Sequence, residues 1–97
     1  MAYMIHHFWP GATEAQYNAT VAVVHPPEGL PEGLPEGQIY HAAGRTANGV
    51  LITAIWESKE QNDRFIQDVL MASMPIEGGV EGQPQVHAGE VMSIHKA

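Results

Sequence analysis

Histidine is the residue type in this 97-residue chain that is best suited to acid–base chemistry. An imidazole titrates near neutral pH, so it can take a proton from a weakly acidic hydroxyl group. Two of the six histidines, His6 and His41, stand in stretches that we expect to form strands. We predict that they are catalytic, each as a candidate general base. The alternative for each is a structural histidine whose ring is satisfied by hydrogen bonds inside the fold.

Three aromatic side chains are candidates for contacts with a substrate. Phe8 and Trp56 lie in or at the end of apolar stretches, and Tyr40 lies just before His41. Aromatic rings offer a large apolar surface, and tyrosine and tryptophan add one polar atom each. We therefore predict that Phe8, Tyr40 and Trp56 line a pocket for a compact apolar or aromatic metabolite. The alternative for Trp56 is a core anchor that does no more than bury its ring.

Metal and nucleophile chemistry have little support in the sequence. His6 and His7 are neighbours in a predicted strand, so they point to opposite faces and cannot bind one metal ion together. A metal site would need distant residues such as His41 and His95 to converge. The chain contains no cysteine and no Gly-x-Ser-x-Gly, phosphate-loop or dinucleotide-binding motif. We predict no metal and no cofactor.

The overall charge restricts the partners. Four Lys and Arg residues stand against eleven Asp and Glu residues, which gives a formal net charge of −7. Such a chain repels phosphate backbones and anionic lipid headgroups, so we predict neither a nucleic-acid nor a membrane partner. No stretch has the length and apolar character of a signal peptide or a membrane span. We therefore expect a cytoplasmic protein.

One local pattern occurs twice in the chain: an apolar stretch that ends in tryptophan, followed by a helix-start signal. The first copy continues into Thr13-x-x-Gln16 and the second into Ser58-x-x-Gln61. In such a capping box the hydroxyl accepts a hydrogen bond from a helix N–H, and the Gln side chain reaches back to the N–H of the capping residue. The pattern predicts two strand–helix units.

Hydrophobic periodicity and turn residues predict the remaining elements. We expect strands over residues 3–9, 38–45, 51–57 and 86–96, and helices over 13–25 and 58–74. In the second helix, Phe65, Val69 and Ala72 should form one apolar stripe, with Ile66 and Leu70 beside it, because residues three or four apart share a helix face. Asn48-Gly49 is the preferred central pair of a type I′ turn, so it should join the second and third strands in a hairpin.

Residues 26–37 form a Pro/Glu/Gly-rich segment that contains three tandem copies of a Pro-Glu-Gly unit. Each copy pairs a proline that fixes a turn with a glycine that relaxes it, so a loop is expected here. The loop could be a lid over a pocket. The alternative is a connection lengthened by repeat expansion, which costs little entropy.

The predicted order of elements, β-α-β-β-α-β, is that of a ferredoxin-like α+β domain spanning residues 1–97. Right-handed crossovers would place the first and third strands at the centre of a four-stranded antiparallel sheet, with both helices on one face. The strand at 50–56 is apolar on both faces, so the face without helices also needs a cover. We predict a homodimer that packs sheet to sheet.

The chain resembles the dimeric α+β barrel superfamily, in which two such protomers pair. The resemblance rests on His6-His7-Phe8-Trp9-Pro10-Gly11, on Trp56-Glu57-Ser58 and on Asp63-Arg64-Phe65, and it points to antibiotic-biosynthesis-monooxygenase-like and stress-responsive members. It implies either a cofactor-independent monooxygenase or a non-enzymatic binding or assembly protein.

The haem-degrading branch of this superfamily is a poor match. Its members resemble one another in an Asn on the first strand, a Trp at the end of the third and a His on the second helix. Here only Trp56 has a counterpart, because the first strand has no Asn and residues 58–74 have no His. The axial ligand that haem requires is therefore missing.

Overall fold

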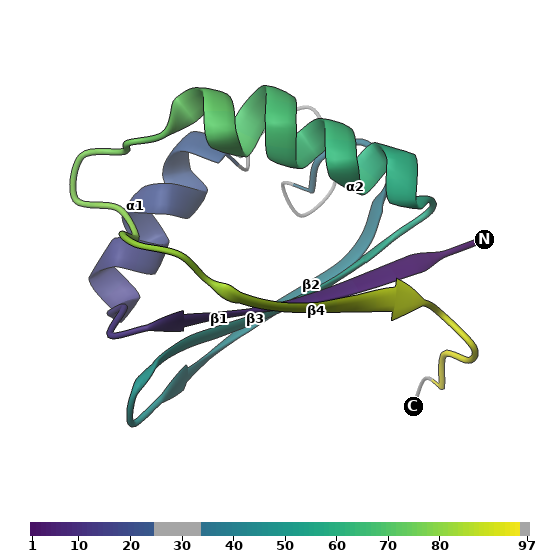
Figure 1. The fold of residues 1–97 in the computed structure, drawn as a ribbon, viewed down its shortest axis with the longest axis horizontal. Helices are drawn as coiled ribbons and strands as arrows, with labels where there is room; N and C mark the ends of the chain where they lie inside the picture. Colours follow the sequence, from purple (N-terminus) through teal and green to yellow (C-terminus); the bar gives the residue numbers. More distant parts are fainter. Residues whose placement is uncertain (25–33, 96–97) are drawn as a thin grey trace.

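The protein folds into one antiparallel sheet with its helices on a single face (Figure 1). A computed structural model describes residues 1–24 and 34–95. Its elements are β1 (Tyr3–Pro10), α1 (Glu14–Val24), β2 (Gln38–Thr46), β3 (Gly49–Trp56), α2 (Lys59–Phe65), η2 (Ile66–Met71) and β4 (Gln85–Glu90). The strand order is β2-β3-β1-β4, so β1 and β3 are central. The predicted ferredoxin-like α+β fold is confirmed. Most of the predicted loop at 26–37 lies outside the described residues.

Both helices begin at the predicted capping residues. At α1 the box is reciprocal: Gln16 N–H donates to Thr13 Oγ1 at 3.2 Å, and Thr13 N–H donates to Gln16 Oε1 at 3.0 Å. At α2 the Gln61 N–H donates to Ser58 Oγ at 3.2 Å. The Gln61 Oε1 atom, however, accepts from the Ser58 hydroxyl at 3.0 Å and not from the Ser58 backbone N–H. Only the first box is therefore complete.

The β2–β3 hairpin forms as predicted, but its turn lies one residue earlier. Thr46 pairs with Gly49, so the two connecting residues are Ala47 and Asn48 rather than the predicted Asn48-Gly49. Gly49 is the first residue of β3 and has a positive φ, and a Cβ at this position would clash with the carbonyl oxygen of Trp9. The close approach of β1, and not the turn itself, therefore requires this glycine.

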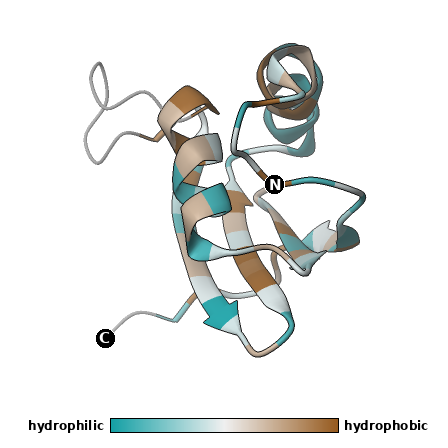
Figure 2. Ribbon diagram, turned by 90° about the vertical axis from the view of Figure 1, so that its left-hand side faces the viewer, coloured by the Kyte–Doolittle hydropathy of each residue, from teal (hydrophilic) through white to brown (hydrophobic). Residues whose placement is uncertain are grey.

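The sheet has an inner face towards the helices and an outer face away from them. On β1, the side chains of Ile5, His7 and Trp9 belong to the inner face. Because strand residues alternate, Met4, His6 and Phe8 belong to the outer face. Figure 2, which shows α2 end-on, has both helices beside each other over the same face of the sheet. In Figure 1, none of the helices and strands formed by residues 1–24 and 34–95 lies across the outer face.

The second helix changes its geometry halfway. After Phe65 it continues as η2, a π-helical segment whose hydrogen bonds span five residues instead of four. Phe65, Ile66 and Leu70 line the space under the helix, whereas Val69 lies in a groove outside it. The predicted core face is therefore correct at Phe65, Ile66 and Leu70, and Val69 lies at its edge.

The last strand is shorter than the predicted 86–96. β4 pairs with β1 from Gln85 to Glu90, and the last pair is Tyr3 with Glu90, where β1 begins. One further hydrogen bond runs from the Val91 N–H to the Ala2 carbonyl oxygen at 2.9 Å. Beyond it the described chain leaves the sheet. Neither described helical segment, α1 or α2 with η2, is long and apolar enough to cross a membrane.

Candidate functional site

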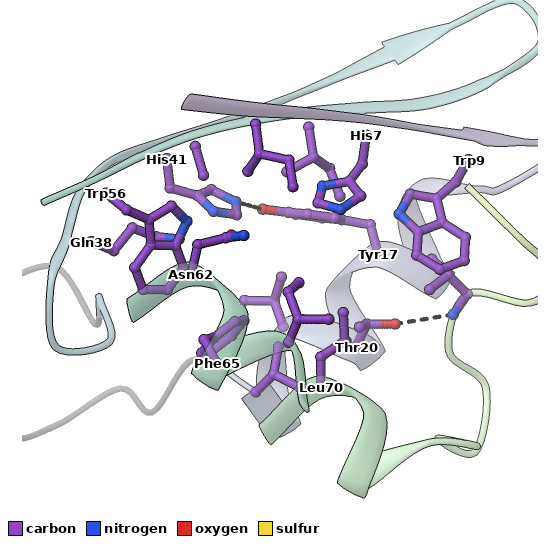
Figure 3. A pocket seen from close by; sticks show the side chains of 17 residues that line it. His7, Trp9, Tyr17, Thr20, Gln38, His41, Trp56, Asn62, Phe65 and Leu70 are labelled. Atoms are coloured by element: carbon purple, nitrogen blue, oxygen red, sulfur yellow. Dashed lines mark hydrogen bonds between the residues drawn. The ribbon is translucent and has the colours of Figure 1, made fainter. Parts of the chain in front are cut away.

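A cavity lies between the inner face of the sheet and the two helices (Figure 3). Its wall consists of strand residues Ile5, His7, Trp9, Gln38, His41, Ile52, Ala54 and Trp56, helix residues Tyr17, Thr20, Val21, Val24, Asn62, Phe65, Ile66 and Leu70, and Val80 from the connection to β4. Most of its surface is apolar. The π-helical segment η2 contributes Ile66 and Leu70 to this wall.

The cavity suits a compact ligand. The centres of water-sized molecules can occupy about 70 Å³ of it. Since a cavity needs at least about 10–15 Å³ to hold one water, there is room for several waters or for one small ligand in their place.

One end of the cavity is polar and unsatisfied. Trp56 Nε1, Gln38 Oε1 and Asn62 Oδ1 are buried, and none has a hydrogen-bond partner in the described part of the chain. Figure 3 shows the three side chains together with His41 at this end. Trp56 is 1 % exposed and Asn62 2 % exposed, so bulk water does not solvate them. Each unpaired group of this kind costs about 1–3 kcal/mol.

The wall also holds a tyrosine–histidine pair. Tyr17 Oη lies 2.6 Å from His41 Nε2, and the hydrogen bond joins α1 to β2. Burial raises the pKa of the Tyr17 hydroxyl and lowers the pKa of His41. Both shifts favour the neutral forms, so at neutral pH the pair is an uncharged phenol beside an uncharged imidazole.

His7 is a second imidazole in the wall, on β1. Figure 3 shows its ring directed into the cavity. Burial is the main cause that lowers its pKa, and the neighbouring His6 lowers it further. Lining residues from the described parts of the chain include no Lys, Arg, Asp or Glu. The cavity is therefore electrically neutral and offers no counter-ion to a charged ligand.

The far end of the cavity is closed by a clip between α1 and the β4 connection. The Val80 N–H donates to Thr20 Oγ1 at 3.0 Å, and the same hydroxyl donates to the Gln16 carbonyl oxygen at 2.9 Å. Thr20 and Val80 are both buried. The clip fixes the position of α1, and hence of Tyr17, relative to the sheet.

The structure separates the five predicted site residues into two groups. His41 and Trp56 lie in the cavity wall. His6, Phe8 and Tyr40 are absent from the wall, because their strand positions have the opposite parity. His6 Nδ1 lies 3.3 Å from Thr53 Oγ1, and Tyr40 is 52 % exposed on the outer face. Trp56 also packs in the core, with its ring centroid 5.2 Å from that of Phe65.

Five polar residues of the cavity were not predicted as site residues: His7, Tyr17, Thr20, Gln38 and Asn62. Tyr17 and Thr20 lie within the predicted helix at 13–25, and Gln38 lies at the start of a predicted strand. Asn62 carried a recognisable signal: it lies three and four residues before Phe65 and Ile66, so an amide stands on the apolar face of the helix. No group of three His, Asp or Glu side chains that could hold a metal ion occurs within residues 1–24 and 34–95.

Comparison with known proteins supports the fold. Neither a protein-family model nor a curated protein sequence matches the chain significantly. A Chloroflexus aurantiacus J-10-fl structure, provisionally described as an antibiotic biosynthesis monooxygenase, is similar at a TM-score of 0.62 and 18 % identity over 99 % of this chain and 98 % of its own. SnoaB, a cofactor-independent oxygenase from Streptomyces nogalater, is similar at a TM-score of 0.57 and 12 % identity over 96 % of this chain and 94 % of its own. The chain therefore has the fold of the antibiotic-biosynthesis-monooxygenase-like proteins, as its sequence resemblance indicated.

Proposed function

We propose that the cavity binds a compact neutral phenol or enol and that the protein oxidises this ligand with molecular oxygen without a cofactor. The observation that carries the proposal is the polar end of the cavity. Three buried polar atoms, on Gln38, Trp56 and Asn62, stand unpaired beside an apolar space of ligand size. A fold tolerates such a cost where a ligand repays it.

The lining groups restrict the ligand to a narrow class. Trp56 Nε1–H can only donate a hydrogen bond, whereas the amides of Gln38 and Asn62 offer both oxygen and NH₂ groups. A hydroxyl or carbonyl group on an aromatic ring would satisfy them. A carboxylate or phosphate would enter a neutral cavity without a counter-ion, which costs several kcal/mol. The ligand is therefore neutral when it binds.

The proposed reaction needs no external electron donor. The ligand loses the hydroxyl hydrogen and one ring or vinyl hydrogen, and gains one oxygen atom as a second carbonyl group. The other oxygen atom of O₂ leaves as water with these two hydrogens. His41 is the base that this chemistry requires, and a water-poor cavity protects the electron-rich anion from reprotonation. SnoaB, with a similar fold, is a cofactor-independent oxygenase, which supports this class of reaction.

A second copy of the chain is the proposed cover of the outer face. Cross-strand pairing places Met4 beside Ile55, and Ile55 beside Tyr40, in one row of this face. Phe8 and Leu51 form a second apolar row, four residues further along the strands. Met4 is 40 % exposed and Tyr40 52 % exposed, so the single chain leaves apolar side chains in water. Within such a homodimer, His6 and Phe8 would contact the partner.

Binding and oxygen uptake test the proposal together. Both tryptophans of the chain line the cavity, so their fluorescence should be quenched when a naphthol or hydroxyquinone binds. An oxygen electrode then measures uptake with the same compounds, using heat-denatured protein as the blank. Quenching with uptake of one O₂ per ligand consumed supports the oxygenase. Quenching without uptake leaves the alternative, a binding protein, and no quenching by any compound contradicts the ligand site.

A further inference from the structure

We infer that Tyr17 is a catalytic residue, the direct acceptor of the substrate's proton, with His41 behind it as the base. The inference rests on the proposed function, because it assigns the proton transfer of that reaction to a particular pair of atoms. The main observation behind the inference is the 2.6 Å hydrogen bond between Tyr17 Oη and His41 Nε2. Both residues line the cavity, and they come from different elements.

The two side chains are held in place from both sides. His41 belongs to the inner face of β2, where it pairs with Ala54 of the buried core. Tyr17 lies near the start of α1, between the Thr13 capping box and the Thr20 clip. Figure 3 shows the Tyr17 ring reaching across the cavity wall to His41. Because both side chains are already fixed, they lose no further rotamer entropy when the hydrogen bond is used in a turnover.

The hydrogen bond has a favoured direction. A phenol is the better hydrogen-bond donor and a neutral imidazole nitrogen the better acceptor, so the Tyr17 hydroxyl donates to Nε2. His41 then carries its own hydrogen on Nδ1. The lone pairs of Tyr17 Oη remain available as acceptors for a hydroxyl group in the cavity. His41 Nε2, by contrast, already accepts from Tyr17 and cannot reach the substrate hydroxyl itself.

Proton transfer through this pair balances in atoms and charge. The substrate hydroxyl gives its proton to Tyr17 Oη while the Tyr17 proton moves to His41 Nε2, which leaves a substrate anion, a neutral tyrosine and an imidazolium. The carbon of the anion then bonds to O₂ and forms a peroxide anion. The same path returns the proton to the peroxide. Cleavage of the O–O bond and loss of the hydrogen on that carbon give the carbonyl product and water.

Tyr17 also borders a shallow groove on the outside of the cavity wall. Glu14, Asn18 and Arg45 line this groove, and Glu14 Oε1 lies 3.0 Å from Arg45 Nη1. The two charges pair with each other on the exposed side of the ring. On its buried side, the cavity residues of the described chain around Tyr17 are all neutral, so a substrate anion would be the counter-ion of the positive charge on the relay.

A chromogenic phenol tests the relay without turnover. 4-Nitrophenol is yellow only as the phenolate, so its absorbance reports whether the bound probe has lost its proton. Wild type should bind it and lower its apparent pKa. Tyr17→Phe keeps the ring but removes the acceptor oxygen, and His41→Gln removes the base. Both should bind the neutral probe with at most about tenfold lower affinity and abolish the shift. Tyr3→Phe, outside the cavity wall, should behave as wild type.

A second measurement on the ligand-free wild type keeps the inference testable if a variant fails to fold. Nitrogen chemical shifts of the His41 ring by NMR distinguish the two tautomers. The relay requires the hydrogen on Nδ1 and an acceptor Nε2. The opposite tautomer would overturn it, as would a pKa shift of the probe that survives Tyr17→Phe or His41→Gln. A probe that binds but stays neutral overturns the relay alone, whereas a probe that does not bind overturns the proposed function with it.

Discussion

Trp56 and Phe65 are in ring contact, with centroids 5.2 Å apart and planes tilted by 44°. The contact joins the end of β3 to the last α-helical turn before the π-helical segment. It therefore fixes the polar end of the cavity, where Trp56 presents its Nε1–H and the preceding turn of α2 presents Asn62. These few side chains contribute both to the stability of the fold and to the proposed ligand site, and substitutions can distinguish the two contributions.

Asn62→Leu should separate stability from binding. The Asn62 oxygen is buried without a partner in the described structure, so an apolar replacement removes a cost. We expect the free energy of unfolding to stay equal or to rise by up to about 1 kcal/mol, while naphthol binding weakens by about tenfold or more. Urea unfolding and fluorescence titration measure the two effects. Gln67→Leu, which also replaces an amide side chain by leucine but at an exposed position nearby, is the control. A less stable variant that still binds would refute the assignment of Asn62.

Leu70→Phe should block the cavity, and Val69→Phe should not. Leu70 lines the cavity, whereas Val69 lies in an outer groove with Glu36 and Arg64. A larger side chain at Leu70 fills the ligand space, so naphthol quenching should disappear, with stability changed by no more than about 1–3 kcal/mol. Equal effects of the two substitutions would contradict the placement of Leu70 inside the cavity and Val69 outside it.

The protein should lose stability as the pH falls below 6.5. Burial lowers the pKa values of His7 and His41 from the ordinary 6.5, so in this range the unfolded chain binds more protons than the folded one. The free energy of unfolding is therefore constant above the unfolded pKa and decreases as the pH falls towards the folded values. Asp63 does not contribute, because its lowered pKa lies below 3.8. Urea midpoints between about pH 7.5 and about pH 5.5 measure the slope.

The double variant His7→Gln, His41→Gln provides the control for this pH effect. Its urea midpoint should depend less on pH over the same interval, since the two buried imidazoles are gone. A wild-type midpoint that stays level or rises on acidification would contradict the buried, neutral state of both rings.

Ile55→Lys should prevent self-association. Ile55 lies in the middle of an outer-face row, between Met4 and Tyr40, so a charge here would be buried in the proposed homodimer. Light scattering should give a dimer for wild type and a monomer for the variant. Val23→Lys changes an exposed apolar residue on α1 and should leave the dimer intact. A monomeric wild type at micromolar concentration would refute the homodimer.

The fold was predictable because its signals are local. Capping residues, turn residues and strand-like apolar stretches each depend on a few neighbouring residues, and they agree on one order of elements. The errors arose where a distant strand decides the outcome. Gly49 was attributed to a turn because Asn-Gly is a turn signal, although the carbonyl group of Trp9 is what excludes a side chain. The pairing of β4 ends where β1 begins, which no signal within residues 86–96 reveals.

The site was only half predictable, because strand parity is a property of the assembled sheet. His6 and His7 are equivalent in the sequence, and only the position of the helices puts His7 in the cavity and His6 on the outer face. His41 and Trp56 fell on the inner face, whereas Phe8 and Tyr40 did not. Tyr17 was visible as a helix residue, but its bond to His41 crosses 24 positions, which no local pattern encodes.

The most direct test of the ligand site is an NMR experiment on the protein with 2-naphthol. The account predicts one naphthol per chain, with nuclear Overhauser effects from its ring protons to the methyl groups of Ile5, Val24 and Leu70, which line the cavity. Effects confined to outer-face side chains such as Met4 and Ile55, or none at saturating naphthol, would contradict it.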